Sequence, residues 1–329
     1  MATKDYEFVL LFEKFIKYSY SGKRVKADGN KIKPQTVDNY MYVLRYLKEY
    51  EGKYKIVLRI KIMSGYNKRI FIAERNYWKK FYTQFTDFLY NSKNCYDNYV
   101  GTVIKVIRIF FNFLNKDMSI QTGEFYKTFY VRREEVPIVT LLPEQLQFLI
   151  CNTDFENTLS KSLQKTKDVF VFGCTVALRV SDLFAIKFND IEKVGSFYYL
   201  PVKTIKTGTV VRIKLPDYAI AIVEKFKYAA KGRKTIFPPI PRTRFNNQLK
   251  EIAELAGWTK DMGRQRKKRG VNTKTIVKDD GSQHRFCDLV SSHTMRRTAI
   301  TTMLMFGMKE HVVKKISGHS DNSKSFHQC

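Results

Sequence analysis

The chain has 329 residues, of which 44% are hydrophobic and 14% aromatic, and it carries 59 Lys and Arg residues against 31 acidic ones. This composition excludes a disordered chain, and the length allows two domains with separate cores. The net charge of +28 exceeds what solubility needs and predicts a polyanionic partner. Nucleic acid is the leading candidate, because a phosphate backbone favours many dispersed Lys and Arg contacts; a merely solvated basic surface is the alternative.

Composition also predicts a protein that works in a reducing, cytoplasmic compartment and has no membrane-spanning helix. No apolar run reaches roughly 18 residues, and the first residues lack the apolar core of a signal peptide. There is no G-x-x-x-x-G-K-[ST] motif, and no acidic cluster accompanies the basic residues, which disfavours a metal-dependent nuclease. The absence of a C-x-x-C pair argues against a disulfide framework and a cysteine zinc site. The cysteines are Cys95, Cys151, Cys174, Cys287 and Cys329.

Residues 1–130 are predicted to form a small helical domain with basic side chains on its surface. Apolar positions recur at helical spacing, and the expected helices are 7–20, one that begins at Thr36 or Asp38, 75–92 and 98–115. A Gly-containing loop after the first helix and one face of the last helix are rich in basic residues, which are expected to contact DNA phosphates unless the loop is only a solvated turn. These residues are Lys23, Arg24, Lys26, Lys31, Lys33, Lys105 and Arg108.

A linker, residues 131–141, is predicted between this domain and a second one that spans 142–329. The linker is charged and contains Pro137, and Pro143 suits the first turn of a new helix. The second domain is expected to be mostly helical with a hairpin in 197–217 that turns at Thr207-Gly208. The expected helices are 143–155, 161–186, 216–231, 243–256, one that Gly307 ends, and one over "MKEHVVKKISGH". The run "GRQRKKRG" holds Arg266, Lys267 and Lys268, which are predicted to face DNA or, alternatively, only solvent.

Two basic residues of the second domain stand in unusual settings. Arg179 is flanked by apolar residues in "CTVALRVSDLF", so it is expected to pair with an acid such as Asp182 or to face a ligand, because an unpaired buried charge is costly. Lys206 in "KTIKTGT" precedes the predicted hairpin turn, from which a flexible ammonium could reach into a groove. Taken alone, it is an ordinary hairpin lysine.

The stretch "SHTMRRT" places His293 and Arg296 three residues apart, on one face of a predicted helix. A guanidinium there could neutralise an anion while the imidazole moves a proton. H-x-x-R alone is weak evidence, since it is more often an exposed helix face. A Gly-His pair that ends in His319 follows the next predicted helix.

In this order the motifs resemble the catalytic set of the tyrosine recombinases, the site-specific recombinases and mobile-element integrases related to type IB topoisomerases. The matching positions are Arg179 in "LRVSDL", Lys206 in "IKTG", His293 and Arg296 in "SSHTMRRTAITTML", and His319 in "ISGHS". The residues of these motifs are most similar to those of integrases of conjugative transposons, and residues 1–130 resemble that group's SAM-like core-binding domain. The resemblance implies a mostly α fold with a small β-hairpin, in which the SAM-like domain and an α+β catalytic domain clamp double-stranded DNA.

The resemblance also implies DNA strand exchange without metal or cofactor. A tyrosine attacks a phosphodiester, forms a 3′-phosphotyrosine link and frees a 5′-hydroxyl, and a partner strand later reverses the step. Arg179 and Arg296 would clamp the nonbridging oxygens, and Lys206 would protonate the leaving 5′-oxygen. His293 would help move the nucleophile's proton, and His319 would hydrogen-bond a nonbridging oxygen. The expected function is integration and excision of a mobile element by a homotetramer on two DNA sites.

The position of the nucleophile departs from this family. The tyrosine is expected nine or ten residues after the second histidine, and since 329 − 319 = 10, that position is Cys329. Three interpretations remain open: an engineered or truncated version that traps uncleaved DNA, a natural variant that binds without cutting, and a thiol nucleophile. The tail that family members add after this point is expected to be missing. The alternative function is a catalytically silent DNA-binding protein that occupies attachment sites.

Overall fold

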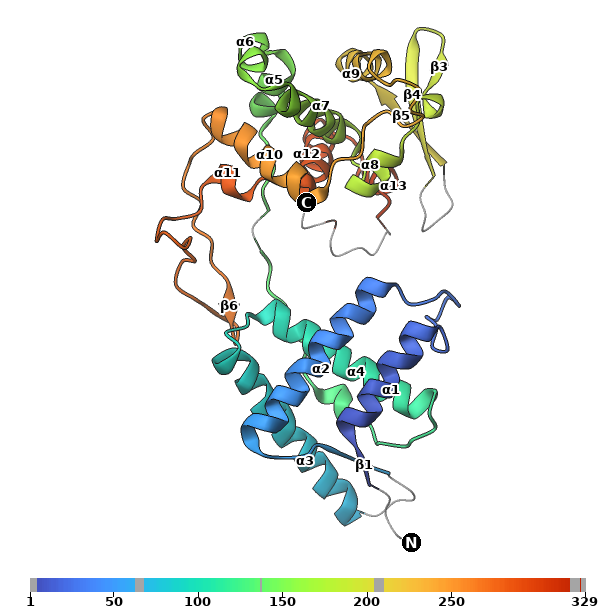
Figure 1. The fold of residues 1–329 in the computed structure, drawn as a ribbon, viewed down its shortest axis with the longest axis vertical. Helices are drawn as coiled ribbons and strands as arrows, with labels where there is room; N and C mark the ends of the chain where they lie inside the picture. Colours follow the sequence, from blue (N-terminus) through green and yellow to red (C-terminus); the bar gives the residue numbers. More distant parts are fainter. Residues whose placement is uncertain (1–4, 63–67, 137, 204–209, 320–325, 327–329) are drawn as a thin grey trace. The chain divides into compact units, whose positions relative to one another are not determined.

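The computed structural model describes residues 5–62, 68–136, 138–203, 210–319 and 326 (Figure 1). The chain divides into two compact units. The helical unit comprises Met1–Glu134 together with Gln265–Lys274, and the mixed unit comprises Glu135–Arg264 together with Thr275–Cys329. The predicted fold class, mostly helical with small sheets, is confirmed.

The helical unit is built from four long helices and short accessory elements within the residues described. The helices are α1 (Phe8–Ser21), α2 (Pro34–Tyr54), α3 (Lys68–Asp87) and α4 (Asp97–Lys116), with a π-helical turn η1 (Phe88–Ser92) and a 3₁₀ turn η2 (Phe125–Thr128). The strands are β1 (Asp5–Glu7), which pairs antiparallel with β2 (Arg59–Lys61), and β6 (Lys267–Lys268), which pairs antiparallel with β7 (Val271–Asn272).

Aromatic rings form the core of the helical unit. Phe8 of α1 contacts Phe110 of α4 edge to face at 4.9 Å between ring centres, and Trp78 of α3 contacts Phe111 at 4.8 Å. These four side chains are at most 2% exposed. Burial of each such ring stabilises the fold by about 1.5–3 kcal/mol, and edge-to-face geometry adds to this. The apolar spacing in the sequence therefore becomes one aromatic core shared by three helices.

Three details of the helical unit differ from the sequence-based expectation. α2 begins at Pro34, before Thr36, because proline is already preorganised for the first helical turn and its missing N–H needs no partner there. The helix expected over 75–92 begins at Lys68 and ends in the π-helical turn η1. The short strands β1 and β2 were not predicted, since three-residue strands leave little periodic signal.

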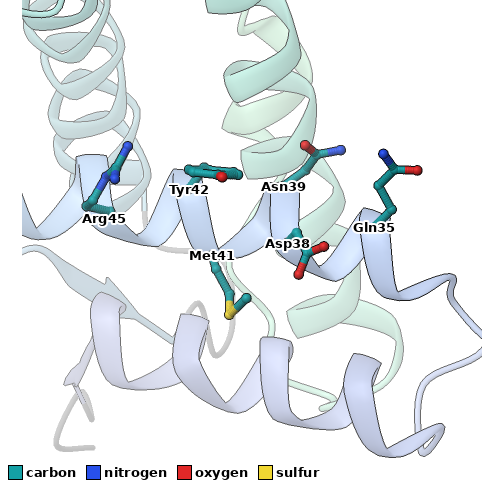
Figure 2. A pocket seen from close by; sticks show the side chains of 6 residues that line it. All are labelled: Gln35, Asp38, Asn39, Met41, Tyr42 and Arg45. Carbon is teal, nitrogen blue, oxygen red and sulfur yellow. The ribbon is translucent and has the colours of Figure 1, made fainter. Parts of the chain in front are cut away.

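The outer face of α2 carries a shallow hollow of about 510 Å³ (Figure 2). Gln35, Asn39, Tyr42 and Arg45 point to one side of the helix, one helical turn after another. All four side chains are exposed, and the Arg45 guanidinium lies 5.3 Å from the centre of the Tyr42 ring. This face therefore presents amide, phenol and guanidinium groups to the surroundings of the helical unit.

The mixed unit contains helices of varied length and one three-stranded sheet within the part of the chain described. Its helices are α5 (Pro143–Cys151), α6 (Thr153–Thr158), α7 (Lys161–Val176), α8 (Val180–Ala185), α9 (Asp217–Tyr228), α10 (Arg242–Leu255), α11 (Phe286–Leu289), α12 (Ser292–Met305) and α13 (Glu310–Ser317), with a 3₁₀ turn η3 (Phe188–Asp190). Its strands are β3 (Glu192–Val194), β4 (Phe197–Lys203) and β5 (Val210–Leu215).

Helix α7 is the central element of the mixed unit, and it packs against α12, α10, α9 and α5. Gly173 permits the close approach of α12, because a Cβ at this position would lie only 2.4 Å from the Met295 sulfur. The helix expected over 161–186 is interrupted, since Ala177 adopts a left-handed backbone (φ 56°) and ends α7 before α8 begins. The helix expected over 143–155 is likewise divided into α5 and α6 at Asn152, whose side chain accepts the N–H of Phe155.

The sheet has the antiparallel order β3-β4-β5. In the register of β4 and β5, Leu200 lies opposite Ile213, and both side chains are buried in the core of the mixed unit. The predicted hairpin is therefore present, with an additional strand at its edge. Its turn, Thr207-Gly208, lies outside the described residues.

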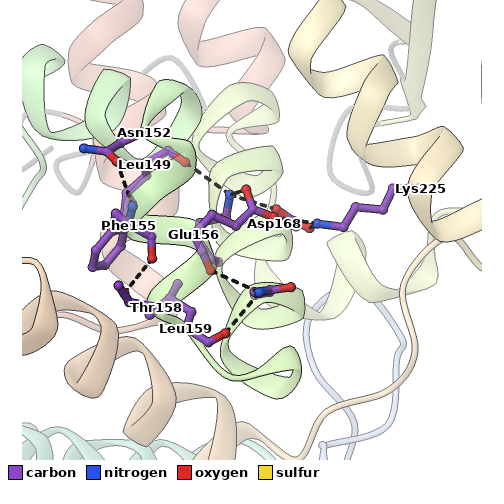
Figure 3. A network of polar contacts seen from close by, with 10 residues as sticks. Leu149, Asn152, Phe155, Glu156, Thr158, Leu159, Asp168 and Lys225 are labelled. Carbon is purple, nitrogen blue, oxygen red and sulfur yellow. Dashed lines mark hydrogen bonds and ion pairs between the residues drawn. The ribbon is translucent and has the colours of Figure 1, made fainter.

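A charge network around the buried Lys167 and Asp168 joins α6, α7 and α9 (Figure 3). The Lys167 ammonium contacts Glu156 at 2.7 Å and Asp168 at 3.2 Å, and it donates a hydrogen bond to the Leu149 carbonyl. Lys225 of α9 binds the same two carboxylates. Because a buried ammonium needs such partners, the network fixes the relative positions of these helices.

Candidate functional site

Arg179 lies in the extended break between α7 and α8, as the residue that precedes α8. Its carbonyl accepts the N–H groups of Asp182 and Leu183, and its side chain is exposed. Pairing with Asp182, one of the two alternatives from the sequence, does not occur: among the described residues no acid pairs with Arg179, and Asp182 instead accepts a hydrogen bond from Ser181. The left-handed backbone at Ala177 thus presents the guanidinium at the surface of the mixed unit.

His293 and Arg296 lie in the first half of α12, as predicted, but in different environments. His293 is exposed, whereas Arg296 is only 7% exposed. The Arg296 guanidinium donates to the carbonyl of Ala177 at 2.9 Å and to the carbonyl of Ser317. It therefore joins α12 to the break after α7 and to the end of α13, the segments that carry Arg179 and His319.

His319 follows directly after α13 and faces Arg296. Its two ring nitrogens each lie 3.4 Å from one Arg296 nitrogen, and its Nδ1 lies 2.7 Å from the Ser317 hydroxyl. The Phe326 ring lies 5.4 Å from the imidazole, edge to face, and is 3% exposed. These contacts set the orientation of the His319 ring.

Positive charge surrounds the His293 imidazole. Partial burial, followed by the charges of Arg297, Arg242, Arg296 and Arg179, lowers the pKa of His293 below its usual value. The imidazole is therefore neutral at pH 7 and can accept a proton. Four guanidinium groups within electrostatic reach of one neutral imidazole form a strongly anion-attracting site. Arg242, at the start of α10, and Arg297 were not singled out from the sequence, because nothing in their local pattern distinguishes them from surface residues.

Two of the predicted catalytic positions, Lys206 and Cys329, lie outside the described residues. The structure thus brings Arg296 and His319 into contact and places Arg179 and His293 in the same electrostatic surroundings. Among the described residues, no group of three His, Cys, Asp or Glu side chains could hold a metal ion. None of the helices described is long and apolar enough to cross a bilayer.

The predicted DNA-binding residues of the helical unit differ in how far they are engaged within it. Lys26, Lys31 and Lys33 are exposed in the loop before α2, and Lys23, also exposed, lies 5.4 Å from the Tyr18 ring. Arg24 is half-buried: it donates to the Ser19 hydroxyl and lies 4.7 Å from the Phe15 ring. On α4, Lys105 is exposed and Arg108 half-buried.

The basic run around Arg266 belongs to the helical unit. The Arg266 side chain binds Glu134 with 2.6 Å between Nε and Oε1, and Lys268 binds the Asn94 side chain. Lys267 keeps its side chain exposed. The run was predicted to face DNA or solvent. The contact with Glu134, which the local sequence does not indicate, instead holds the Arg266 guanidinium within the protein.

The outer face of α2 was not identified from the sequence. Gln35, Asn39 and Arg45 have the side chains that form bidentate contacts with adenine and guanine in the major groove. The signal was present as polar residues spaced by three and four positions. This spacing does not distinguish the face, because it is typical of any solvent-exposed helix face.

Comparison with known proteins identifies the family. The phage integrase family matches residues 141–326, more than half of the chain. No curated protein sequence matches. The fold is similar to that of a lambda integrase dimer bound to a COC′ core site (TM-score 0.61, 12% identity, 99% of this chain and 77% of that chain). It is also similar to the Tn1549 transposon integrase in complex with transposon right-end DNA (TM-score 0.61, 12% identity, 98% and 94%).

A third similar structure is the XerH site-specific recombinase bound to its difH substrate (TM-score 0.57, 10% identity, 97% of this chain and 81% of that chain). At these identities the likeness shows the fold. The family match extends from α5 to Phe326 and includes Arg179, His293, Arg296 and His319. The chain therefore belongs to the phage integrase family of tyrosine recombinases.

Proposed function

We propose that the protein is the integrase of a mobile element, which cuts and rejoins double-stranded DNA at specific sites. The observation that carries this is the arrangement of Arg179, His293, Arg296 and His319 at the ends of α7, α12 and α13. Such a cluster suits an anion whose charge grows during reaction, as that of a five-coordinate phosphorus does. As in the family, recombination would be carried out by a homotetramer that joins two DNA sites.

The mechanism of the family assigns a role to each side chain. Arg179 and Arg296 bind the nonbridging phosphate oxygens, and His319 donates a further hydrogen bond to them. His293, neutral at pH 7, takes the proton of a tyrosine nucleophile as the phenolic oxygen bonds to phosphorus. Lys206 gives a proton to the 5′-oxygen as the bond between it and phosphorus breaks. The covalent link to the 3′-phosphate retains the bond energy, so resealing needs no nucleotide.

Cys329 stands at the tyrosine position, and we propose that the chain as given binds DNA without efficient cleavage. A thiolate forms more readily than a phenolate, but it is a soft nucleophile on a shorter side chain, and phosphorus is a hard centre. This residue also favours the second candidate function, a protein that occupies attachment sites without cutting.

DNA binding involves both units in this proposal. The exposed lysines Lys23, Lys26, Lys31 and Lys33 contact phosphates next to the outer face of α2, which supplies groups able to read base edges. The affinity is expected to fall steeply with salt, because counterions are released on binding.

Formation of a covalent adduct tests the proposal. The chain as given, Cys329→Tyr and Cys329→Phe are each incubated with nicked duplexes that carry the element's ends, and adducts are resolved on a denaturing gel. We expect an adduct with Cys329→Tyr alone. An adduct with the chain as given would show a working thiol and contradict the proposed cleavage defect. If binding is tight and Cys329→Tyr forms no adduct, the enzyme function is refuted in favour of the silent DNA-binding protein.

A further inference from the structure

The chain leaves the mixed unit after Arg264 and re-enters it at Thr275. The ten residues between, Gln265–Lys274, are here called the strap, and they belong to the helical unit, where Figure 1 labels β6. A hydrogen bond of 2.8 Å from the N–H of Thr273 to the Arg266 carbonyl closes the strap into a ribbon. The strap lies more than 130 residues after the rest of the helical unit in the sequence, so its position there requires anchors.

Asp97 is the first anchor. It lies in the first turn of α4 and is 2% exposed. Its carboxylate accepts the backbone N–H groups of Arg269 at 2.7 Å and Gly270 at 2.8 Å, and also the Tyr90 hydroxyl at 2.5 Å. Arg269 and Gly270 both have positive φ (57° and 84°), which is typical of the two central residues of a tight hairpin turn. This turn directs two successive N–H groups to one buried carboxylate.

Glu134 is the second anchor, with a side chain only 1% exposed. Its carboxylate accepts the Arg266 Nε–H at 2.6 Å and the backbone N–H of Lys267. Its backbone is itself held to α4, because the Asn98 side chain bonds to both the N–H and the carbonyl of Glu134 at 3.0 Å. Two carboxylates next to α4 therefore hold the strap, Asp97 at its turn and Glu134 at its first strand.

Burial separates these anchors from ordinary surface contacts. The Arg269–Asp87 ion pair is 48% and 40% exposed, and exposed pairs of this kind contribute little. By contrast, Asp97 and Glu134 are almost fully enclosed, and most of the donors that satisfy them come from the strap. A buried carboxylate that loses its donors is strongly destabilised. A segment consisting of 1–134 alone would leave both carboxylates without these donors.

We propose that the strap is a non-covalent latch, which the anchors Asp97 and Glu134 hold in the helical unit, so that the direct chain connection from Glu134 to Glu135 is not the only one between the units. The latch restricts the separation of the units and thereby raises the effective concentration of one unit for DNA when the other is already bound. This goes beyond the proposed recombinase function and rests on it only for the DNA measurement below.

Hydrogen–deuterium exchange of the full-length chain tests the latch directly. In Asp97→Asn, one strap acceptor loses its charge, and the strap amides are expected to exchange about tenfold to a hundredfold faster than in the unsubstituted chain. The matched control is Asp117→Asn, which removes an exposed carboxylate from the end of the same helix and is expected to leave strap exchange unchanged. Unchanged strap exchange in Asp97→Asn would overturn the proposal.

If Asp97→Asn accelerates exchange throughout the helical unit, Glu134→Gln is measured in its place, because it removes only the contact to the first strand of the strap. Faster exchange confined to the strap in that variant supports the latch. Strap exchange equal to that of the unsubstituted chain, with the helical unit folded, refutes it. Neither outcome depends on DNA, so failure of the latch is distinguishable from failure of the proposed function.

Duplex affinity gives a second test, in which charge and tethering have opposite effects. Asp97→Asn removes a negative charge from a basic protein, and this change alone would strengthen binding to DNA. If the latch acts as proposed, affinity instead falls by about tenfold, while the slope of log affinity against log salt is unchanged because no phosphate contact is lost. Equal or tighter binding by a variant with a released strap would refute the tethering role.

Discussion

Replacing Arg296 with lysine tests whether this guanidinium stabilises the mixed unit. Arg296 is 7% exposed and donates to two main-chain carbonyls, those of Ala177 and Ser317. These residues are 0% and 2% exposed, so water cannot replace a lost donor. A lysine keeps the charge, but its single ammonium cannot reproduce the planar fork that reaches both carbonyls.

The expected cost follows from these two bonds. A hydrogen bond from a charged donor contributes about 1.5–3 kcal/mol, and a buried carbonyl left without a partner costs about 1–3 kcal/mol. If lysine retains one of the two bonds, the free energy of unfolding of the mixed unit should fall by about 2–4 kcal/mol. Against a total of about 5–15 kcal/mol for a typical domain, this is a large loss.

Urea unfolding measures this cost in the mixed unit alone. The chain has two tryptophans, Trp78 in the helical unit and Trp258 in the mixed unit. In a Trp78→Phe background, fluorescence therefore reports only the mixed unit. The matched control is Arg297→Lys, since the next residue of α12 is half-buried and makes no hydrogen bond or ion pair with the residues described.

A small or non-specific loss of stability would contradict this expectation. A loss of less than about 1 kcal/mol in Arg296→Lys, or one equal to that of Arg297→Lys, would mean that the two carbonyl bonds contribute little. If the cost is as expected, loss of cleavage in any Arg296 variant combines structural and chemical effects.

Two further predictions concern glycine positions and pH. Gly101→Ala should destabilise the helical unit by about 1–3 kcal/mol, because its Cβ would lie 2.0 Å from the Arg132 carbonyl oxygen. In the control Gly52→Ala, the Cβ would meet nothing within 4 Å, so this change should be neutral or stabilise the unit by up to about 1 kcal/mol. Equal shifts in the melting temperature of the two variants would contradict this. Because the pKa of His293 is lowered in the folded state, the unfolded chain binds more protons below about pH 6.5, and the mixed unit should lose stability as the pH falls through that value. His293→Gln should flatten this part of the stability–pH curve measured by urea unfolding, and an unchanged curve would count against the argument.

Features that depend on local pattern can be predicted from the amino-acid sequence alone. Apolar spacing was enough to predict most helices, because a helix buries one face at a period that can be read along the chain. The order of Arg179, H-x-x-R and His319 was enough to indicate the family, which the match to residues 141–326 confirms. The basic excess was visible from composition alone.

Contacts between residues far apart in the chain could not be predicted in this way and are seen only in the folded protein. Ala177 has a left-handed backbone although it is not a glycine, so the sequence gives no sign of this conformation. Its carbonyl accepts a hydrogen bond from Arg296, and Arg179 follows two residues later. The anchors of the strap join Asp97 to Arg269 and Gly270, and Glu134 to Arg266, across more than 130 residues. Such pairings depend on which surfaces meet after each element has formed. A local sequence pattern carries no record of the partner, so these buried carboxylates and their donors emerge only when the chain is folded.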